Sequence, residues 1–181
     1  MEETAVKQQK SWLRAVYEWM EAITIALVVV ALIFAFVFRL VSVDGTSMLN
    51  TLHHGEQLVL SRWPYTPAYE DIVVLTQEGY EKPLIKRVIG LPGDVIDIDE
   101  NGAVYRNGTV LDEPYVDVPT ARESMDEAVK VPDGYVFVMG DNRARSCSVD
   151  SRTFGCVSQE NLLGKAVFRI SPLNQFGGLY D

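Results

Sequence analysis

The chain has 181 residues, a formal net charge of −9 and a sequence pI near 4.7. Its hydrophobic content of 48% is enough for the core of one domain with appendages. A surface that binds nucleic-acid phosphates needs clustered Lys and Arg, so the acidic balance argues against a nucleic-acid partner. The two cysteines, Cys147 and Cys156, have no further Cys or His at metal-ligand spacing. We therefore expect no zinc site and no cofactor.

An uncharged apolar run over residues 22–38 is the first feature along the chain. With residues 39–41 it reaches about the 20 residues that a membrane span needs. Apolar side chains cover every face of the run, which argues against a core helix with one apolar stripe. The sequence therefore predicts a cytoplasmic segment over 1–21, a transmembrane anchor over 22–41 and an extracytoplasmic domain over 42–181.

The orientation of this anchor follows from the charges before it. Lys7, Lys10 and Arg14 precede the run, and the positive-inside rule then places the N-terminus in the cytoplasm. No small-x-small cleavage site follows before Ser47, so we expect an anchor that is not removed. The location predicted is the cell membrane, with a single span.

Beyond the span, short β-branched runs alternate with turn residues, which predicts a mainly β domain of antiparallel strands. Asn107-Gly108 between two such runs predicts a tight hairpin, because a type I′ turn needs positive φ at both central residues. Residues 116–133 are acidic and weakly periodic, and we expect an exposed loop. The predicted strands are 57–61, 72–76, 84–89, 95–98, 104–106, 135–139 and 165–170.

Three polar clusters interrupt these strands, at residues 44–52 (DGTSMLNTL), 86–94 (KRVIGLPGD) and 140–155 (GDNRARSCSVDSRTFG). The order and the residue sequences of these clusters resemble those of the bacterial type I signal peptidases, over almost the whole chain. Leu111-Asp112-Glu113-Pro114-Tyr115 after the hairpin also resembles that family. The resemblance implies a membrane-bound serine protease that acts on secretory preproteins, with a signal-peptidase-like β domain on one span.

The resemblance implies that Ser47 is the nucleophile and Lys86 its general base. A serine hydroxyl needs a neighbouring base, and a lysine serves only when neutral. Lowering a lysine pKa from near 10.4 by about three units needs roughly 4 kcal/mol, and burial is the available cause. Strand alternation places Lys86 on one face with Leu84 and Val88, among apolar neighbours.

The segment around Ser47 offers a donor for the reaction and departs from the family pattern at two positions. The backbone N–H of Ser47, which Met48 follows, is the natural donor to an oxyanion. In some family members a serine two residues before the nucleophile adds a hydroxyl donor, but Gly45 stands there in this chain. Asn50 stands where the family usually has proline, and we expect altered stiffness without loss of chemistry.

The third cluster leaves several alternatives open. Family spacing counted forward from Arg143 selects Ser146 as the partner of Lys86, whereas counting back from Asp150 selects Ser148, which we favour. The charged residues of the cluster either form ion pairs under the site or remain solvated. They are Asp141, Arg143, Asp150 and Arg152.

The cysteines and histidines near these clusters also have open roles. Cys147 and Cys156 either form a disulfide that braces the enlarged loop or remain unpaired thiols. His53 and His54 lie a few residues after Ser47, and we expect them to cap a turn before Gly55 and not to catalyse.

The leading hypothesis is an endopeptidase that acts as a monomer and cleaves preproteins at small-x-small sites, with the substrate extended beside a strand edge. One alternative is a membrane-anchored β domain that binds peptides without cutting them. Another is a peptidase dedicated to a narrow class of surface or pilus subunits. A self-cleaving repressor-type protease is disfavoured, because that family has no membrane span.

Overall fold

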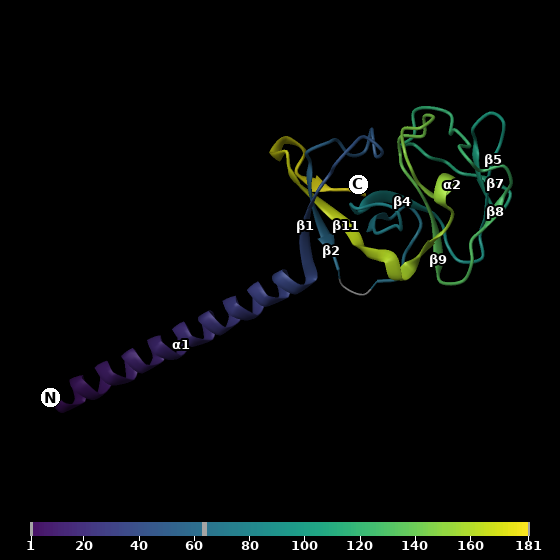
Figure 1. The fold of residues 1–181 in the computed structure, drawn as a ribbon. Helices are drawn as coiled ribbons and strands as arrows, with labels where there is room; N and C mark the ends of the chain where they lie inside the picture. The colour runs from purple at the N-terminus through teal and green to yellow at the C-terminus, as the bar shows by residue number, and fades with distance from the viewer. Residues whose placement is uncertain (1, 63–64, 181) are drawn as a thin grey trace. The chain divides into compact units, whose positions relative to one another are not determined.

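The structure is a computed structural model that describes residues 2–62 and 65–180. The chain divides into two compact units, Met1–Phe38 and Arg39–Asp181. The first unit is the helix α1 (Glu2–Val37), shown in Figure 1. Its segment Arg14–Val37 contains an 18-residue window with a mean hydropathy of 2.7 and is long and apolar enough to cross a membrane.

The helix ends four residues before the expected end of the anchor. Residues 39–41 lie in strand β1 (Phe38–Ser42), which pairs with the next strand of the sheet. Strand pairing satisfies their backbone N–H and C=O groups, which a helix would otherwise satisfy. The apolar helical segment therefore gains its length toward the N-terminus, from Arg14, and not through residues 39–41.

The second unit consists of two antiparallel sheets, which confirms the mainly β fold with one N-terminal helix. The larger sheet has the order β1-β2-β11-β3-β4-β9-β10, with β12 paired to β11. The smaller sheet has the order β7-β6-β5-β8. The strands of the larger sheet after β1 are β2 (Gln57–Ser61), β3 (Ile72–Leu75), β4 (Leu84–Gly90), β9 (Tyr135–Met139), β10 (Val157–Ser158), β11 (Leu162–Ser171) and β12 (Gly177–Gly178).

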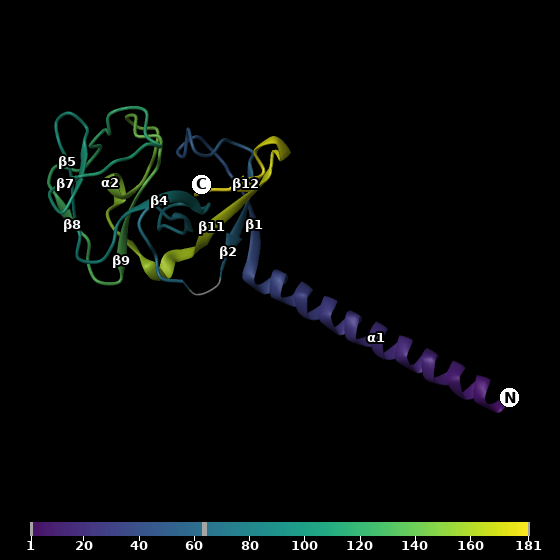
Figure 2. The same cartoon turned by 180° about the vertical axis from the view of Figure 1, so that it is seen from behind.

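The smaller sheet and the short helices complete this unit. Figures 1 and 2 show β5, β7 and β8 on one side of the β unit and β1, β2 and β11 on the other, with β4 and β9 between them. The remaining elements are β5 (Val95–Ile98), β6 (Val104–Arg106), β7 (Thr109–Val110), β8 (Val129–Lys130), α2 (Ser151–Phe154), η1 (Gln159–Asn161) and η2 (Leu173–Gln175).

The predicted hairpin is confirmed, and the predicted loop over 116–133 is only partly correct. Asn107 and Gly108 have φ values of 55° and 77°, and Tyr105 pairs with Val110 across the turn. Within 116–133, however, β8 pairs with β5, and the side chain of Met125 is buried. The polar composition of this stretch conceals its few apolar anchors, so periodicity alone does not reveal them.

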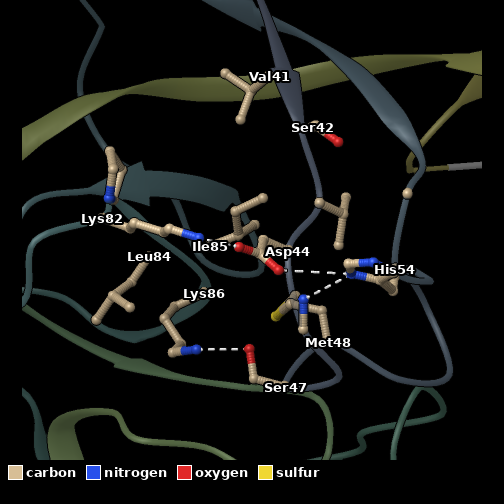
Figure 3. Close-up of a pocket in the computed structure, with 14 residues that line it drawn as sticks. Val41, Ser42, Asp44, Ser47, Met48, His54, Lys82, Leu84, Ile85 and Lys86 are labelled. Carbon is tan, nitrogen blue, oxygen red and sulfur yellow. Dashed lines mark hydrogen bonds and ion pairs between the residues drawn. The ribbon is translucent and has the colours of Figure 1, made fainter.

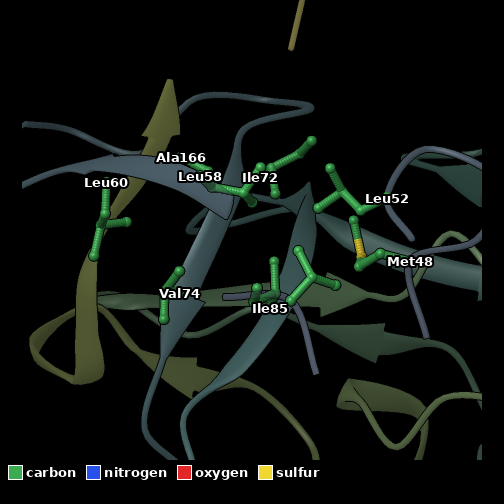
Figure 4. Packing of buried hydrophobic residues seen from close by; sticks show 9 residues of the cluster. Met48, Leu52, Leu58, Leu60, Ile72, Val74, Ile85 and Ala166 are labelled. Atoms are coloured by element: carbon green, nitrogen blue, oxygen red, sulfur yellow. The ribbon is translucent and has the colours of Figure 1, made fainter. Parts of the chain in front are cut away.

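Strand β4 positions the site because apolar clusters cover both of its faces. Ile85 packs in a cluster with Leu58, Ile72 and other side chains of β2 and β3, shown in Figure 4. Val88 packs in a second cluster and Ile89 in a third. Each such buried side chain contributes roughly 1.5–3 kcal/mol. Any polar residue on this strand is therefore held away from water by packing on both sides.

Candidate active site

The structure brings Ser47 and Lys86 together. The Lys86 Nζ donates a hydrogen bond to Ser47 Oγ at 2.7 Å, and Figure 3 shows the two side chains pointing toward one another. Lys86 is the third residue of β4 and is 2% exposed, while Ser47 lies in the turn that follows β1. The pair has the distance that proton transfer between a nucleophile and its base requires.

Burial is the largest influence on the charge of Lys86, because it lowers the pKa of this lysine to about 8. The carboxylates of Asp150 and Asp141 oppose that change, while the Arg152 guanidinium adds to it. No carboxylate among the described residues lies within ion-pair distance of the Lys86 amine. The amine is therefore neutral in roughly one molecule in ten at pH 7.

A pocket of about 480 Å³ extends from this pair. Its apolar wall includes Val41, Val43 and Leu84, and its rim carries an ion pair between Lys82 Nζ and Asp44 Oδ2 at 2.7 Å. Figure 3 draws the lining residues and labels ten of them; the full set is Val41, Ser42, Val43, Asp44, Gly45, Ser47, Met48, His54, Gly55, Lys82, Pro83, Leu84, Ile85 and Lys86. The apolar wall suits apolar side chains of a bound peptide.

The two histidines contact groups other than Ser47. His54 Nδ1 accepts a hydrogen bond from the Gly45 backbone N–H at 3.2 Å and lies 3.6 Å from the Asp44 carboxylate. His53 Nδ1 lies 3.4 Å from Glu56. Within residues 2–62 and 65–180 neither imidazole hydrogen-bonds to the serine.

The turn that carries Ser47, residues 47–51, is called here the nucleophile turn, and the third cluster holds it in place. Asn142 contributes to this contact, although the sequence did not indicate such a role. Its backbone N–H donates to Ser47 O at 3.0 Å, and its side-chain Nδ2 donates to Thr46 O at 3.1 Å. Met48 is 2% exposed and anchors the turn in the core. The Ser47 N–H has no acceptor in the described part of the chain, so it remains available to an oxyanion.

The position where the family usually has proline makes a contact of its own. The Asn50 side-chain amide donates to the carboxylate of Asp117, and the neighbouring Thr51 hydroxyl donates to Asp141. Asn50 thus ties the nucleophile turn to the segment after the hairpin by a side-chain bond that proline does not offer.

The two candidate serines of the third cluster differ sharply in their surroundings. Ser148 is 3% exposed and its hydroxyl donates to Asp150 Oδ2 at 2.6 Å. A Cβ at Gly140 would lie 2.3 Å from Ser148 Oγ and 2.4 Å from Ser47 O, so both serines border this glycine. Ser146 is exposed, and its backbone N–H donates to Glu123. These positions support the preference for Ser148, whose role stays a prediction.

The four predicted charged residues are all buried and all form ion pairs. Two of them pair with each other, and the other two pair with residues outside the third cluster. Asp150 holds Arg152 through two contacts of 2.7 and 2.9 Å. Asp141 pairs instead with Arg87 at 2.6 and 2.9 Å. Arg143 pairs with Glu113 of the Leu111–Tyr115 segment. Sequence spacing did not identify Arg87 and Glu113 as partners, because each lies far along the chain from the residue that it binds.

The cysteines form no disulfide in this structure. Cys147 is an exposed free thiol and Cys156 a half-buried one. The enlarged loop between Arg143 and Asp150 is instead held by the hydrogen bonds of Ser146 and Ser148. Of the two possibilities open from the sequence, the structure has the unpaired thiols.

Comparison with known proteins assigns the family. The family described as "Signal peptidase, peptidase S26" matches residues 16–171. The chain belongs to this family. It is 40% identical over 166 residues to a "Probable signal peptidase I-1" of Synechocystis sp., covering 86% of this chain and 82% of that protein. It is 38% identical over 178 residues to the "Signal peptidase I" of Bacillus licheniformis, covering 89% and 91%.

A solved structure of a signal peptidase I from Enterococcus faecalis V583 also matches. It has a TM-score of 0.47 and 31% sequence identity, and the match covers 56% of this chain and 97% of that one. The family assignment rests on the sequence matches, and it makes this chain a serine protease of the hydrolase class.

Proposed function

We propose that this chain is a membrane-bound endopeptidase that removes signal peptides from exported preproteins, with Ser47 as nucleophile and Lys86 as general base. The observation that carries the proposal is the 2.7 Å hydrogen bond between Lys86 Nζ and Ser47 Oγ in a site where the lysine pKa is lowered to about 8. The names of the sequence relatives, which are signal peptidases I, supply the substrate class.

The proposed mechanism has two stages. Ser47 Oγ attacks the scissile carbonyl while Lys86 Nζ takes its proton, and the Ser47 N–H donates to the oxyanion that forms. The protonated amine then gives this proton to the leaving amino group, which leaves an acyl ester on Ser47. A water molecule that Lys86 deprotonates next attacks the ester and releases the signal peptide. One base thus serves both stages.

The specificity proposed is for small-x-small sites. In an extended peptide, alternate side chains point the same way, so the two small residues would face the same wall of the pocket. That wall is formed by Val41, Val43 and Leu84, whose branched apolar side chains suit apolar residues of the substrate. The β1 strand lies at the end of its sheet, and its free edge can pair with a substrate backbone.

The membrane arrangement proposed has the N-terminus in the cytoplasm and the catalytic unit outside, because Lys7, Lys10 and Arg14 precede the apolar run. The exposed thiol of Cys147 can report on which side of the membrane the β unit lies. In a Cys156→Ser variant, a membrane-impermeant maleimide should label Cys147 in intact cells that lack an outer barrier. Labelling only after the membrane is permeabilised would reverse the proposed topology.

The function is tested with full-length protein in detergent and a preprotein substrate. Ser47→Ala and Lys86→Met should each abolish cleavage, whereas Lys130→Met, a lysine change on the exposed side of β8, should leave it unchanged. A penem should acylate Ser47 in the wild type. Full activity of Ser47→Ala would exclude the proposed nucleophile, and a chain that neither cleaves nor reacts would be a peptide-binding domain. Because one chain supplies both groups, we propose that the monomer is active.

A further inference from the structure

Tyr115 lies between two buried arginines close to the site. Its ring centroid is 3.9 Å from the guanidinium carbon of Arg87 and 5.9 Å from that of Arg143. Burial raises the pKa of Tyr115, so its hydroxyl stays protonated, and it donates to Glu113 Oε1 at 2.9 Å. The negative face of an aromatic ring attracts a guanidinium, more strongly where water is excluded. The ring therefore adds a stacking contact to the hydrogen bonds that hold the plane of Arg87.

Arg87 is adjacent to Lys86 on β4 and reaches both other clusters. Its guanidinium holds Asp141 at 2.9 and 2.6 Å and lies 3.3 Å from the Thr51 hydroxyl, which itself donates to Asp141. Thr51 ends the nucleophile turn, and Asp141 precedes Asn142, whose backbone N–H binds Ser47 O. The orientation of one guanidinium thus sets the base strand against the nucleophile turn.

The segment that carries Tyr115 also contacts the turn directly. We call residues Glu113–Asp117 the strap. Its first residue pairs with Arg143, its middle residue stacks on Arg87, and its last accepts a hydrogen bond from Asn50. The strap therefore contacts all three clusters that supply the site, although it lies some thirty residues beyond Lys86 in the sequence.

From these contacts we infer that Tyr115 is a positioning residue for the reaction, which holds Ser47 and Lys86 in register through Arg87. This inference rests on the proposed function. A displacement of the dyad by a fraction of an ångström lengthens the 2.7 Å hydrogen bond and admits water to the amine. Loss of the ring is therefore expected to lower kcat about tenfold or more and to leave KM nearly unchanged, since Tyr115 does not line the pocket.

The chain offers a matched control at a second stacked tyrosine. Tyr69 lies 3.7 Å from the guanidinium carbon of Arg106, and its hydroxyl donates to Asp94 at 3.0 Å. The distances therefore repeat those of Tyr115, Arg87 and Glu113, although Tyr69 is more exposed. Arg106 donates to Ile89 O and, within the described residues, makes no hydrogen bond to the nucleophile turn or the third cluster.

The experiment compares Tyr115→Leu, Tyr115→Phe and Tyr69→Leu in full-length protein in detergent, by kcat, KM and the pH profile of preprotein cleavage. Tyr115→Leu should lose about tenfold or more in kcat and move the acid limb of the profile to higher pH, because water then reaches Lys86. Tyr115→Phe keeps the ring and should stay within about threefold, and Tyr69→Leu should match the wild type within about twofold. Equal kcat values and equal profiles for Tyr115→Leu and Tyr69→Leu would overturn the inference.

Two further measurements keep the test decisive. If Tyr115→Leu does not fold, phenylalanine analogues of increasing fluorination at position 115 keep the ring volume and weaken its negative face. Under the inference kcat falls along that series, and a flat series overturns it. Ser47→Ala is measured in parallel. Retained activity in that variant would overturn the proposed function. If Ser47→Ala is inactive but the Tyr115 variants cleave like the wild type, only the positioning role is overturned.

Discussion

The rate of cleavage should rise with pH up to about pH 8, because only the neutral form of Lys86 accepts the serine proton. With a pKa of about 8, roughly one molecule in ten carries the neutral amine at pH 7, and roughly one in a hundred at pH 6. An ordinary lysine of pKa 10.5 would leave only about one in 3,000 neutral at pH 7. Burial therefore increases the reactive fraction about 300-fold, equivalent to about 3 kcal/mol.

The assay is kcat/KM for preprotein cleavage between pH 5.5 and 9.5, since this constant reports the ionisation of the free enzyme. The logarithm of the rate should rise with a slope near one below pH 7.5 and level off above about 8.5. The rate of Ser47 acylation by a penem should follow the same curve, because it needs the same base. Circular dichroism at each pH checks that the chain remains folded.

Two results would refute this reasoning. A rate that is flat between pH 6 and 8 would show that no group of pKa about 8 controls the serine. A rate that continues to rise to pH 10 would show that the amine of Lys86 is as solvated as in an unfolded chain, and hence that packing on both faces of β4 does not exclude water.

Three further predictions follow from the buried groups. Charged Lys86 destabilises the fold below pH 8, and this penalty is relieved between pH 8 and 10.5. Lys86→Met should therefore raise the free energy of unfolding at pH 7 by about 1–3 kcal/mol, and by less at pH 10.5. Urea titration at the two pH values measures both changes. Ser148→Ala should lower kcat about tenfold and Ser146→Ala should not, in the same cleavage assay, because only Ser148 is buried beside the site. Gly140→Ala should lower the melting temperature markedly while Gly177→Ala does not, since a Cβ meets two atoms below 2.5 Å at the first and none within 4 Å at the second.

The sequence predicted the strands and the reacting pair because both depend on local information. Gln57–Ser61, Val95–Ile98 and Tyr135–Met139 form strands with the predicted bounds, since each alternates or runs apolar between turn residues. Ser47 and Lys86 could be predicted as the reacting residues because each lies in a cluster whose residue sequence resembles that of the family. Their separation of 2.7 Å could not be predicted, since it depends on how a turn packs against a strand 39 residues away.

The ion pairs and the end of the helix were less predictable for a physical reason. A charged residue gives no sign in the sequence of which distant partner it meets, so Arg87 with Asp141 and Arg143 with Glu113 emerge only from the fold. The helix end at Val37 depends on β1 joining β2, a pairing between segments that composition does not reveal. In both cases the deciding contact is long-range, whereas the sequence pattern is local.

The arrangement of partners explains why one buried cation in this site loses its proton near pH 8 while the others stay charged. Arg87, Arg143 and Arg152 each hold a carboxylate at ion-pair distance, and a guanidinium does not lose its proton in proteins. Lys86 is equally buried, but among the described residues it meets a hydroxyl in place of a carboxylate. An ammonium without a counter-ion is costly in such surroundings, so the amine releases its proton at a lower pH than an ordinary lysine does. A carboxylate moved into contact with Lys86 would therefore raise its pKa and remove the base, even though it would add an ion pair to the fold.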